Sequence, residues 1–380
     1  MIKPEQFYKL LQSNGVEFFT GVPDSLLKDI CAYITEKTKY SRHIIAANEG
    51  NAVALASGYY LATEKIPLVY MQNSGIGNAI NPLLSLADED VYSIPMLLMI
   101  GWRGEPGIKD EPQHIKQGKV TLGVLDAMGI EYVILPDSFN EAQIVIEKSI
   151  QRISQTKCPF ALIVKKNTFE SYSLNEGSTK VLSISRENAI KVIVDHLEED
   201  AIVVSTTGKA SRELFEYRSQ KGQGHQRDFL TVGSMGHANQ IALTIALEKP
   251  NRNVYCFDGD GAVLMHTGGM GIIGDYKPQN LKHIIFNNGA HESVGGQPTI
   301  GFDVDFSKLA KGFNYSTTLK ASSKEEIEKY MPLLKNTQGP ILLEIWVSMD
   351  SRKDLGRPTI SPKNNKNDFM RFLQDGSNNI

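Results

Sequence analysis

The sequence predicts an α/β protein made of two doubly wound parallel-sheet domains. Short apolar runs rich in β-branched residues alternate with helical patterns along nearly the whole chain, which is typical of a parallel sheet covered by helices on both faces. The alternation stops at a polar, glycine-containing stretch, "SLNEGSTKVLS", and then starts again. With 380 residues the chain is long enough for two such domains. We therefore expect a first domain over residues 1–172, a linker over 173–183 and a second domain over 184–380.

The first domain should open with a helix, because "MIKPEQFYKLLQSNG" has an ordinary helical pattern and not that of a secretory signal. Helical stretches such as "NAVALASGYYLAT" separate the apolar runs that follow. The expected strands, in order, are "VEFFT", "HIIAA", "PLVYM", "IPMLLMIG", "EYVIL" and "FALIVKK".

The second domain should begin with the amphipathic helix "SRENAIKVIVDHL", which carries Ala189, Ile190, Ile193 and Leu197 on one side. The expected strands are "AIVVS", "NVYCF", "LKHIIF" and "ILLEIWV". The polar tail after Ser361 fits either a short terminal helix or a partly disordered segment. Ligands bind at the carboxyl ends of strands in such sheets, so the loops that follow the strands hold the candidate site.

Composition excludes several classes of function. The net charge of -3 gives no reason to expect nucleic acid or an acidic membrane surface as a partner. The three cysteines are far apart and form no CxxC pair, so we expect neither a disulfide framework nor a structural zinc site. No apolar run approaches the ~18 residues that span a bilayer. We expect a cytoplasmic protein with no membrane partner.

The stretch "FDGDGAVLMHTGGM" places Asp260 between two glycines at the end of an expected buried strand. A glycine-rich turn of this kind often holds phosphate, although a tight surface turn is the plainer interpretation. The dinucleotide motif GxGxxG is excluded because position 264 is leucine, which also disfavours a nicotinamide oxidoreductase. The phosphate-binding loop of nucleotide hydrolases is excluded at "TTGKAS", where Val203 stands in place of the first glycine.

Asn287 and Asn288 end the next expected strand, so Asp260 and Asn288 can face one point. Carboxylate and amide oxygens suit Mg²⁺ or Ca²⁺, and Mg²⁺ commonly completes its shell with phosphate oxygens and water. The pattern therefore indicates a diphosphate held through a divalent cation.

The spacing of GDG and NN resembles the binding signature of thiamine-diphosphate enzymes. The resemblance implies that thiamine diphosphate and Mg²⁺ are the cofactors. It implies that Asp260, Asn288 and the backbone oxygen of Ala290 are the metal ligands, and that Met235 supports the bent cofactor. The other cofactor contacts expected in the second, diphosphate-binding domain are Thr207, Gly208, Ser234, Gly259, Gly261 and Ala262.

The family also needs a glutamate that hydrogen-bonds the aminopyrimidine ring. Glu49 in "NEGNAVALASGYY" matches the family pattern E-x-x-A-x-x-x-A-x-G-Y, which makes the first domain the pyrimidine-binding domain. Taken alone, Glu49 would be an acid favourably placed in the first turn of a helix. Many family members have histidine before this glutamate, whereas this chain has Asn48.

The segments "GVPDSLLK", "GWRGEPGIKDEPQH", "NNGAHESVGGQPT" and "SRKDLGRPT" resemble the branch of the family that decarboxylates phosphonopyruvate, and this branch has no middle domain. The expected reaction converts 3-phosphonopyruvate to phosphonoacetaldehyde and CO₂ in phosphonate biosynthesis, which makes the protein a carboxy-lyase. Glu49, His114 and Asp24 are the expected catalytic residues, and Arg103, Ser25 and Lys209 are the expected substrate contacts. A guanidinium between glycines, as in Arg103, suits a phosphonate.

Alternatives remain at this point. The substrate could carry a sulfonate in place of the phosphonate, or the chain could be a carboligase of the same family. A non-catalytic cofactor-binding protein is disfavoured by the presence of Glu49. The resemblance also implies a homo-oligomer, a dimer at minimum, with each active site at a subunit interface and a small 2-oxo acid as substrate.

Overall fold

The computed structural model describes residues 1–174 and 182–375, and most of the expected linker lies outside these ranges. The chain divides into two compact units. Unit 1 comprises Met1–Gly177 with His291–Pro298, and unit 2 comprises Ser178–Ala290 with Thr299–Ile380. Each unit contains a six-stranded sheet whose paired strands are all parallel. The expected fold class is therefore confirmed.

Unit 1 has the strand order β2-β1-β3-β4-β6-β5. Its strands are β1 (Phe19–Gly21), β2 (His43–Ile45), β3 (Leu68–Gln72), β4 (Leu97–Gly101), β5 (Glu131–Ile134) and β6 (Phe160–Val164). Its helices are α1 (Pro4–Ser13), α2 (Lys28–Lys37), α3 (Glu49–Thr63), α4 (Ile76–Pro82), α5 (Pro112–Ala127) and α6 (Phe139–Thr156). Each strand lies within or beside its expected apolar run.

Unit 2 has the strand order β13-β14-β10-β9-β7-β8. Its strands are β7 (Ile202–Ser205), β8 (Asp228–Leu230), β9 (Val254–Gly259), β10 (Leu281–Asn287), β13 (Thr317–Ala321) and β14 (Ile341–Trp346). Its helices are α7 (Arg186–His196), α8 (Lys209–Gln220), α9 (Ala238–Glu248), α10 (Asp260–Met265), α11 (Gly268–Tyr276), α12 (Phe306–Gly312), α13 (Lys324–Asn336) and α14 (Pro362–Asp375). The short strands β11 (Ala290–His291) and β12 (Gln297–Pro298) form a separate two-stranded pair, of which all but Ala290 belongs to unit 1.

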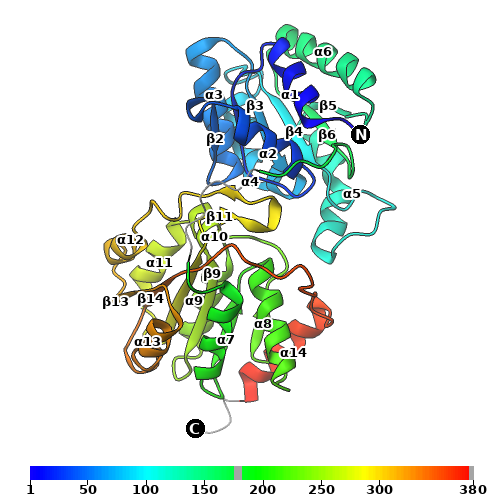
Figure 1. The fold of residues 1–380 in the computed structure, drawn as a ribbon. Coiled ribbons are helices and arrows are strands. Elements are labelled where there is room, and N and C mark those ends of the chain that lie inside the picture. Colours follow the sequence, from blue (N-terminus) through cyan, green and yellow to red (C-terminus); the bar gives the residue numbers. More distant parts are fainter. Residues whose placement is uncertain (175–181, 376–380) are drawn as a thin grey trace. The chain divides into compact units, whose positions relative to one another are not determined.

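Helices cover both faces of each sheet (Figure 1). In unit 1, one apolar layer is shared with α1, α2 and α6, and the other with α3, α4 and α5. In unit 2, α7, α8 and α13 cover one face, while α9, α11 and α12 cover the other. Strands that are buried on both faces are apolar at most positions, which explains why their nearly continuous runs were recognisable in the sequence.

Two edge strands of unit 2, β8 and β13, were not expected from the sequence. Strand β8 has three residues, so it is too short to give a pattern. Of the two interpretations of the polar tail, the structure supports a terminal helix, α14. The Asn365 side chain of this helix accepts a hydrogen bond from the Leu230 N–H and donates one to the Asp228 carbonyl oxygen. This helix therefore satisfies backbone groups that the edge strand would otherwise leave unpaired. Among the described residues, no helix combines the length and the apolar character needed to cross a bilayer.

Each sheet has a point where the order of strands reverses. In unit 1 the chain runs from β1 out to β2 and then returns to β3 on the other side of β1. In unit 2 the chain makes the same reversal from β7 to β8 and back to β9. Ligands of open α/β sheets bind outside the carboxyl ends of the strands at such switch points. The loops after β1, β3, β7 and β9 are therefore the places to seek a site.

Candidate active site

In unit 2, Asp260 lies directly after β9 at the switch point, as the first residue of α10. Its side chain is 3% exposed and its Oδ2 accepts a hydrogen bond from the Thr299 hydroxyl. Burial raises the pKa of Asp260 to about 6, and the hydrogen bonds from Thr299 and neighbouring backbone groups oppose that shift. A carboxylate buried in this way would be stabilised by a nearby cation.

The two asparagines at the end of β10 have different roles. Asn288 is buried and its Oδ1 accepts from the backbone N–H of Ala290 at 3.1 Å. Asn287 points elsewhere, since its Nδ2 donates to the Gly301 carbonyl oxygen at 2.7 Å and to Glu344 Oε1 at 2.8 Å. Strand β10 pairs with β9 so that Phe286 is opposite Gly259, which brings Asn288 and Asp260 to the same edge of the sheet.

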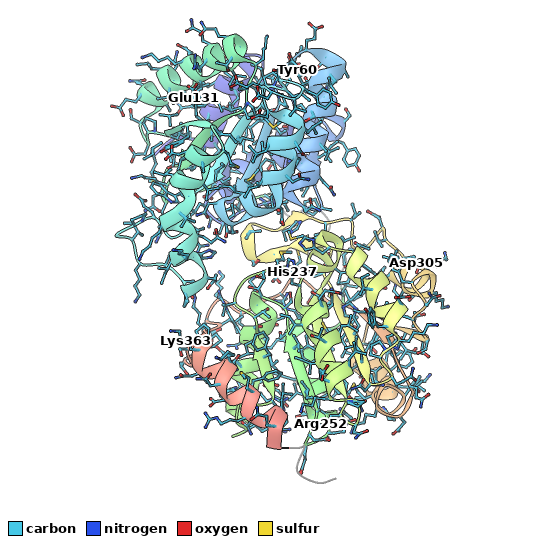
Figure 2. All side chains as sticks on the ribbon, turned by 180° about the vertical axis from the view of Figure 1, so that it is seen from behind. Tyr60, Glu131, His237, Arg252, Asp305 and Lys363 are labelled. Carbon is cyan, nitrogen blue, oxygen red and sulfur yellow. The ribbon has the colours of Figure 1, made fainter. Side chains whose placement is uncertain are left out.

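The loop before α9 contains Ser234 and Met235. Ser234 and Gly236 both have positive φ, at 54° and 84°. A Cβ on Gly236 would lie 2.6 Å from the His266 ring, so glycine is needed for this loop to pack against the end of α10. His237 follows the loop, and Figure 2 shows it at the opposite end of unit 2 from Arg252, which precedes β9. The loop therefore lies at the carboxyl end of the sheet.

Thr207 and Gly208 connect β7 to α8 on the other side of the switch point. Gly208 has a φ of 98°, and a Cβ added to Gly208 or to Gly259 would meet nothing within 4 Å. Both turns therefore have open space beside their backbone. Lys209, expected to contact substrate, opens α8 and donates a hydrogen bond to the Ser351 hydroxyl.

In unit 1, Glu49 is the first residue of α3, which Asn48 caps by accepting from the Asn51 N–H. The Glu49 side chain is 5% exposed, and its Oε2 accepts from Asn78 Nδ2 at 2.7 Å. Burial raises its pKa, and the Asn78 hydrogen bond partly offsets that effect. A Cβ on Gly75 would lie 2.3 Å from Glu49 Oε1. The glycine therefore leaves the space that the carboxyl group occupies.

Asp24 follows β1, and its side chain bonds to the end of β3, the other strand of the unit 1 switch point. Its side chain is fully buried, and its Oδ1 accepts from Gln72 Nε2 at the end of β3 at 2.8 Å. Its Oδ2 accepts from the Leu26 N–H at 2.9 Å. Burial raises the pKa of Asp24, while the Gln72 and Leu26 hydrogen bonds and the nearby Arg103 charge act in the other direction.

Arg103 lies just beyond the end of β4, and its guanidinium already has protein partners. Its Nε donates to Asp110 Oδ2 at 2.8 Å, its Nη2 donates to Asp110 Oδ1 at 2.5 Å, and its Nη1 donates to Ser25 Oγ at 2.7 Å. The N–H groups of Gly104 and Glu111 also donate to the Asp110 carboxylate. Burial opposes ionisation of Asp110, but the Arg103 and Gly104 hydrogen bonds prevail and lower its pKa.

His114 lies in the first turn of α5, in the same loop and helix segment as Asp110. It is buried, its Nδ1 has no hydrogen-bond partner among the described residues, and its pKa falls to about 4 through burial and the Arg103 charge. An imidazole buried in this way is uncharged at neutral pH.

The structure thus groups the expected residues by unit. Asp24, Ser25 and Arg103 form one constellation with His114 nearby, and Glu49 lies at the carboxyl end of the same sheet. Sequence reasoning missed four residues that define these surroundings, namely Gly75, Asn78, Asp110 and Thr299. Asp110 stood in a quoted segment, but no local pattern signals that an acid will pair with an arginine seven residues away.

The residues present fit thiamine diphosphate and a divalent cation. Asp260, Asn288 and the carbonyl oxygen of Ala290 make an oxygen donor set of the kind that Mg²⁺ takes in proteins. Open space beside Gly208 and Gly259 allows a diphosphate to approach the backbone. The buried Glu49 carboxyl has a raised pKa and can share a proton with an aminopyrimidine nitrogen.

Two family models match the chain. The model described as "Thiamine pyrophosphate enzyme, N-terminal TPP binding domain" matches residues 4–133. The model described as "Thiamine pyrophosphate enzyme, C-terminal TPP binding domain" matches residues 206–345. Thiamine diphosphate, with the Mg²⁺ typical of these enzymes, is therefore the cofactor of this chain.

Curated relatives cover nearly the whole chain. A protein of Streptomyces viridochromogenes named phosphonopyruvate decarboxylase is 32% identical in an alignment 378 residues long, which covers 96% of this chain and 93% of the relative. A Streptomyces hygroscopicus protein of the same name is 30% identical and covers 99% and 95%. A Methanosarcina acetivorans protein named sulfopyruvate decarboxylase is 27% identical and covers 86% and 87%. The chain belongs to the thiamine pyrophosphate enzyme family and is a decarboxylase of that family.

Proposed function

We propose that this enzyme decarboxylates 3-phosphonopyruvate to phosphonoacetaldehyde and CO₂. The two Streptomyces relatives support this proposal, since their names give this substrate and their alignments span both units. The observation that carries the catalytic part is the buried Glu49 carboxyl, placed at the carboxyl end of its sheet by α3 and given room by Gly75. A non-catalytic binding protein would not need a carboxyl group with a raised pKa at this position.

Bound thiamine diphosphate supplies a thiazolium ring that accepts the electron pair left when a 2-oxo acid loses CO₂. Glu49 holds a proton on its carboxyl and exchanges it with the aminopyrimidine. Asn78 donates to Glu49 Oε2 and so fixes the orientation of the carboxyl group. Because burial raises the pKa of Glu49, the carboxyl can hold the proton at a pH where an exposed glutamate would lose it.

In unit 2, Asp260, Asn288 and the Ala290 carbonyl oxygen would hold the Mg²⁺ ion. The backbone groups of Thr207, Gly208, Gly259, Gly261 and Ala262 would bind the diphosphate, with Ser234 and Met235 beside the ring system. We retain residues 1–172 as the pyrimidine-binding domain and 184–380 as the diphosphate-binding domain, joined by 173–183.

For the substrate, we propose Asp24, Ser25, Arg103 and His114 of unit 1, and Lys209 of unit 2. Arg103 is the preferred phosphonate ligand because a guanidinium binds such a group through two parallel N–H bonds. Asp110 now accepts from Nε and Nη2, so a phosphonate at this site would share or replace that interaction. His114 stays a catalytic candidate because it lies in the first turn of α5, close enough to Arg103 and Asp110 to feel both charges.

We further propose a homodimer, or a multiple of dimers, in which Glu49 of one subunit and Asp260 of the other serve one cofactor. The support is that the two carboxylates lie in separate units of the chain. An isologous two-fold interface would then create two equivalent sites.

CO₂ release from phosphonopyruvate and sulfopyruvate, measured side by side with and without thiamine diphosphate and Mg²⁺, tests the function. We expect a higher kcat/KM for phosphonopyruvate and no turnover without the cofactor. The Methanosarcina relative makes sulfopyruvate the second candidate, and a preference for sulfopyruvate would replace the first. Carboligation would instead appear as a condensed product when an acceptor aldehyde is supplied.

A further inference from the structure

The loop between β10 and α12 has both of its ends in unit 2, and one buried side chain ties these two ends. Asn287 is fully buried, and its Oδ1 accepts from the N–H of Gly289, where the loop departs, at 3.1 Å. Its Nδ2 donates to the carbonyl oxygen of Gly301, where the loop returns, at 2.7 Å. One amide group therefore holds the two ends of the loop together.

The same amide is anchored to the neighbouring strand, β14. Glu344 is 1% exposed, and its Oε1 accepts from Asn287 Nδ2 at 2.8 Å and from Trp346 Nε1 at 2.6 Å. Lys320 Nζ lies 3.8 Å from Oε2 of this carboxylate. With these partners on both sides of the amide, rotation of Asn287 would break hydrogen bonds to buried groups, which is costly.

The returning end of the loop places Thr299 against Asp260. The Thr299 hydroxyl donates to Asp260 Oδ2 and accepts from the Gly301 N–H at 3.1 Å. Because a hydroxyl has a single proton, the incoming Gly301 N–H directs that proton towards the carboxylate. Position 301 has no room for a side chain, because a Cβ there would lie 2.4 Å from Asp260 Oδ2 and 2.6 Å from Asn287 Oδ1.

We propose that Thr299 is a positioning residue that orients the Asp260 carboxylate for the divalent cation, and that Asn287 holds Thr299 in place. The inference rests on the proposed role of Asp260 as a cation ligand. A group that hydrogen-bonds a metal ligand fixes its orientation, and loss of such a group typically costs about 10–100-fold in metal affinity. Thr299 acts through Asp260 and makes no assigned contact with the substrate.

The test is a titration of Mn²⁺, followed by electron paramagnetic resonance, into each variant at the same fixed concentration of thiamine diphosphate. Thr299→Val keeps the shape of the side chain and removes the hydroxyl, so Mn²⁺ affinity should fall about 10–100-fold. Thr299→Ser keeps the hydroxyl and should bind Mn²⁺ nearly as well as the wild type. The kcat of Thr299→Val at saturating Mn²⁺ should return to near the wild-type value, because only cation binding has been weakened.

Thr244→Val is the matched control, since its hydroxyl bonds to carbonyl oxygens within α9. It should bind Mn²⁺ like the wild type.

Wild-type affinity in Thr299→Val, together with loss of binding in Asp260→Ala, would overturn the role of Thr299 and leave the proposed cation site standing. Wild-type affinity in Asp260→Ala would overturn both. Equal weakening in Thr299→Val and Thr299→Ser would also overturn the proposal, because the hydroxyl would not be the cause. If Thr299→Val fails to fold, Thr299→Ala takes its place.

Discussion

Replacing Gly75 with alanine should displace the catalytic carboxyl group without unfolding the protein. The added Cβ would lie 2.3 Å from Glu49 Oε1 and 2.6 Å from Cδ, whereas ordinary van der Waals contact begins at 3.4 Å. The carboxyl must therefore retreat by about 1 Å, and a displacement of that size can cost about 100-fold in rate. The retreat also disturbs the 2.7 Å hydrogen bond from Asn78. Because the displaced atoms belong to the end of a flexible side chain, the stability cost should stay near the lower end of the ~1–3 kcal/mol seen for overpacking.

The assay for Gly75→Ala has two readouts. The kcat should fall about 100-fold, and deuterium exchange at the thiazolium carbon of bound thiamine diphosphate should slow in parallel, while the affinity for the cofactor changes little. Gly123→Ala is the control, because Gly123 lies within α5 and an added Cβ meets nothing within 4 Å. That variant should keep wild-type kcat and gain up to about 1 kcal/mol of stability. Wild-type kcat and exchange in Gly75→Ala would refute the placement of Glu49 in the mechanism.

Three further predictions concern other parts of the candidate site. Asp260→Ala should lose Mg²⁺ and thiamine diphosphate together in calorimetric titrations, and unchanged affinity for both would remove Asp260 from the site. Arg103→Ala should lower kcat/KM for phosphonopyruvate about 10–100-fold and leave an unsubstituted 2-oxo acid almost unaffected, whereas equal losses would indicate a structural role. Folded His114 has a pKa of about 4 against an ordinary 6.5, so the unfolded chain binds more protons and stability should fall as pH drops from 6.5 to 4. Urea unfolding of His114→Gln should show a smaller loss over this range, and an unchanged acid slope would contradict the neutral, buried state of His114.

The sequence predicted the interior of both sheets well because strands buried on two faces form nearly continuous apolar runs. It missed both edge strands of the unit 2 sheet, β8 and β13, and the reason for β8 is physical. Strand β8 has three residues and starts with the buried Asp228, whose partner Arg218 comes from α8. Such a strand is stabilised by contacts with distant residues, so its own composition carries little information.

The candidate site divides in the same way. Asp260, Asn288 and Glu49 stand in motifs with fixed spacing, and they could be selected from the sequence alone. Thr299 and Asp110 could not be selected in this way. Their roles arise only when a loop folds back, which brings Thr299 against Asp260 and Asp110 against Arg103. Arg103 illustrates the limit best: its type and its glycine neighbours suggested an open anion site, but the fold pairs it with Asp110 and Ser25.

In the proposed dimer, Glu49 and Asp260 serve one cofactor from two different subunits, and one mixing experiment tests this directly. Glu49→Gln and Asp260→Ala chains, each inactive alone, are unfolded, combined in equal amounts and refolded together. Random pairing makes about half of the dimers mixed, and each mixed dimer has both lesions in one site and none in the other, so about a quarter of wild-type CO₂ release should return. If each site were built within a single chain, every site would carry a lesion, and the absence of any recovered activity would contradict the account.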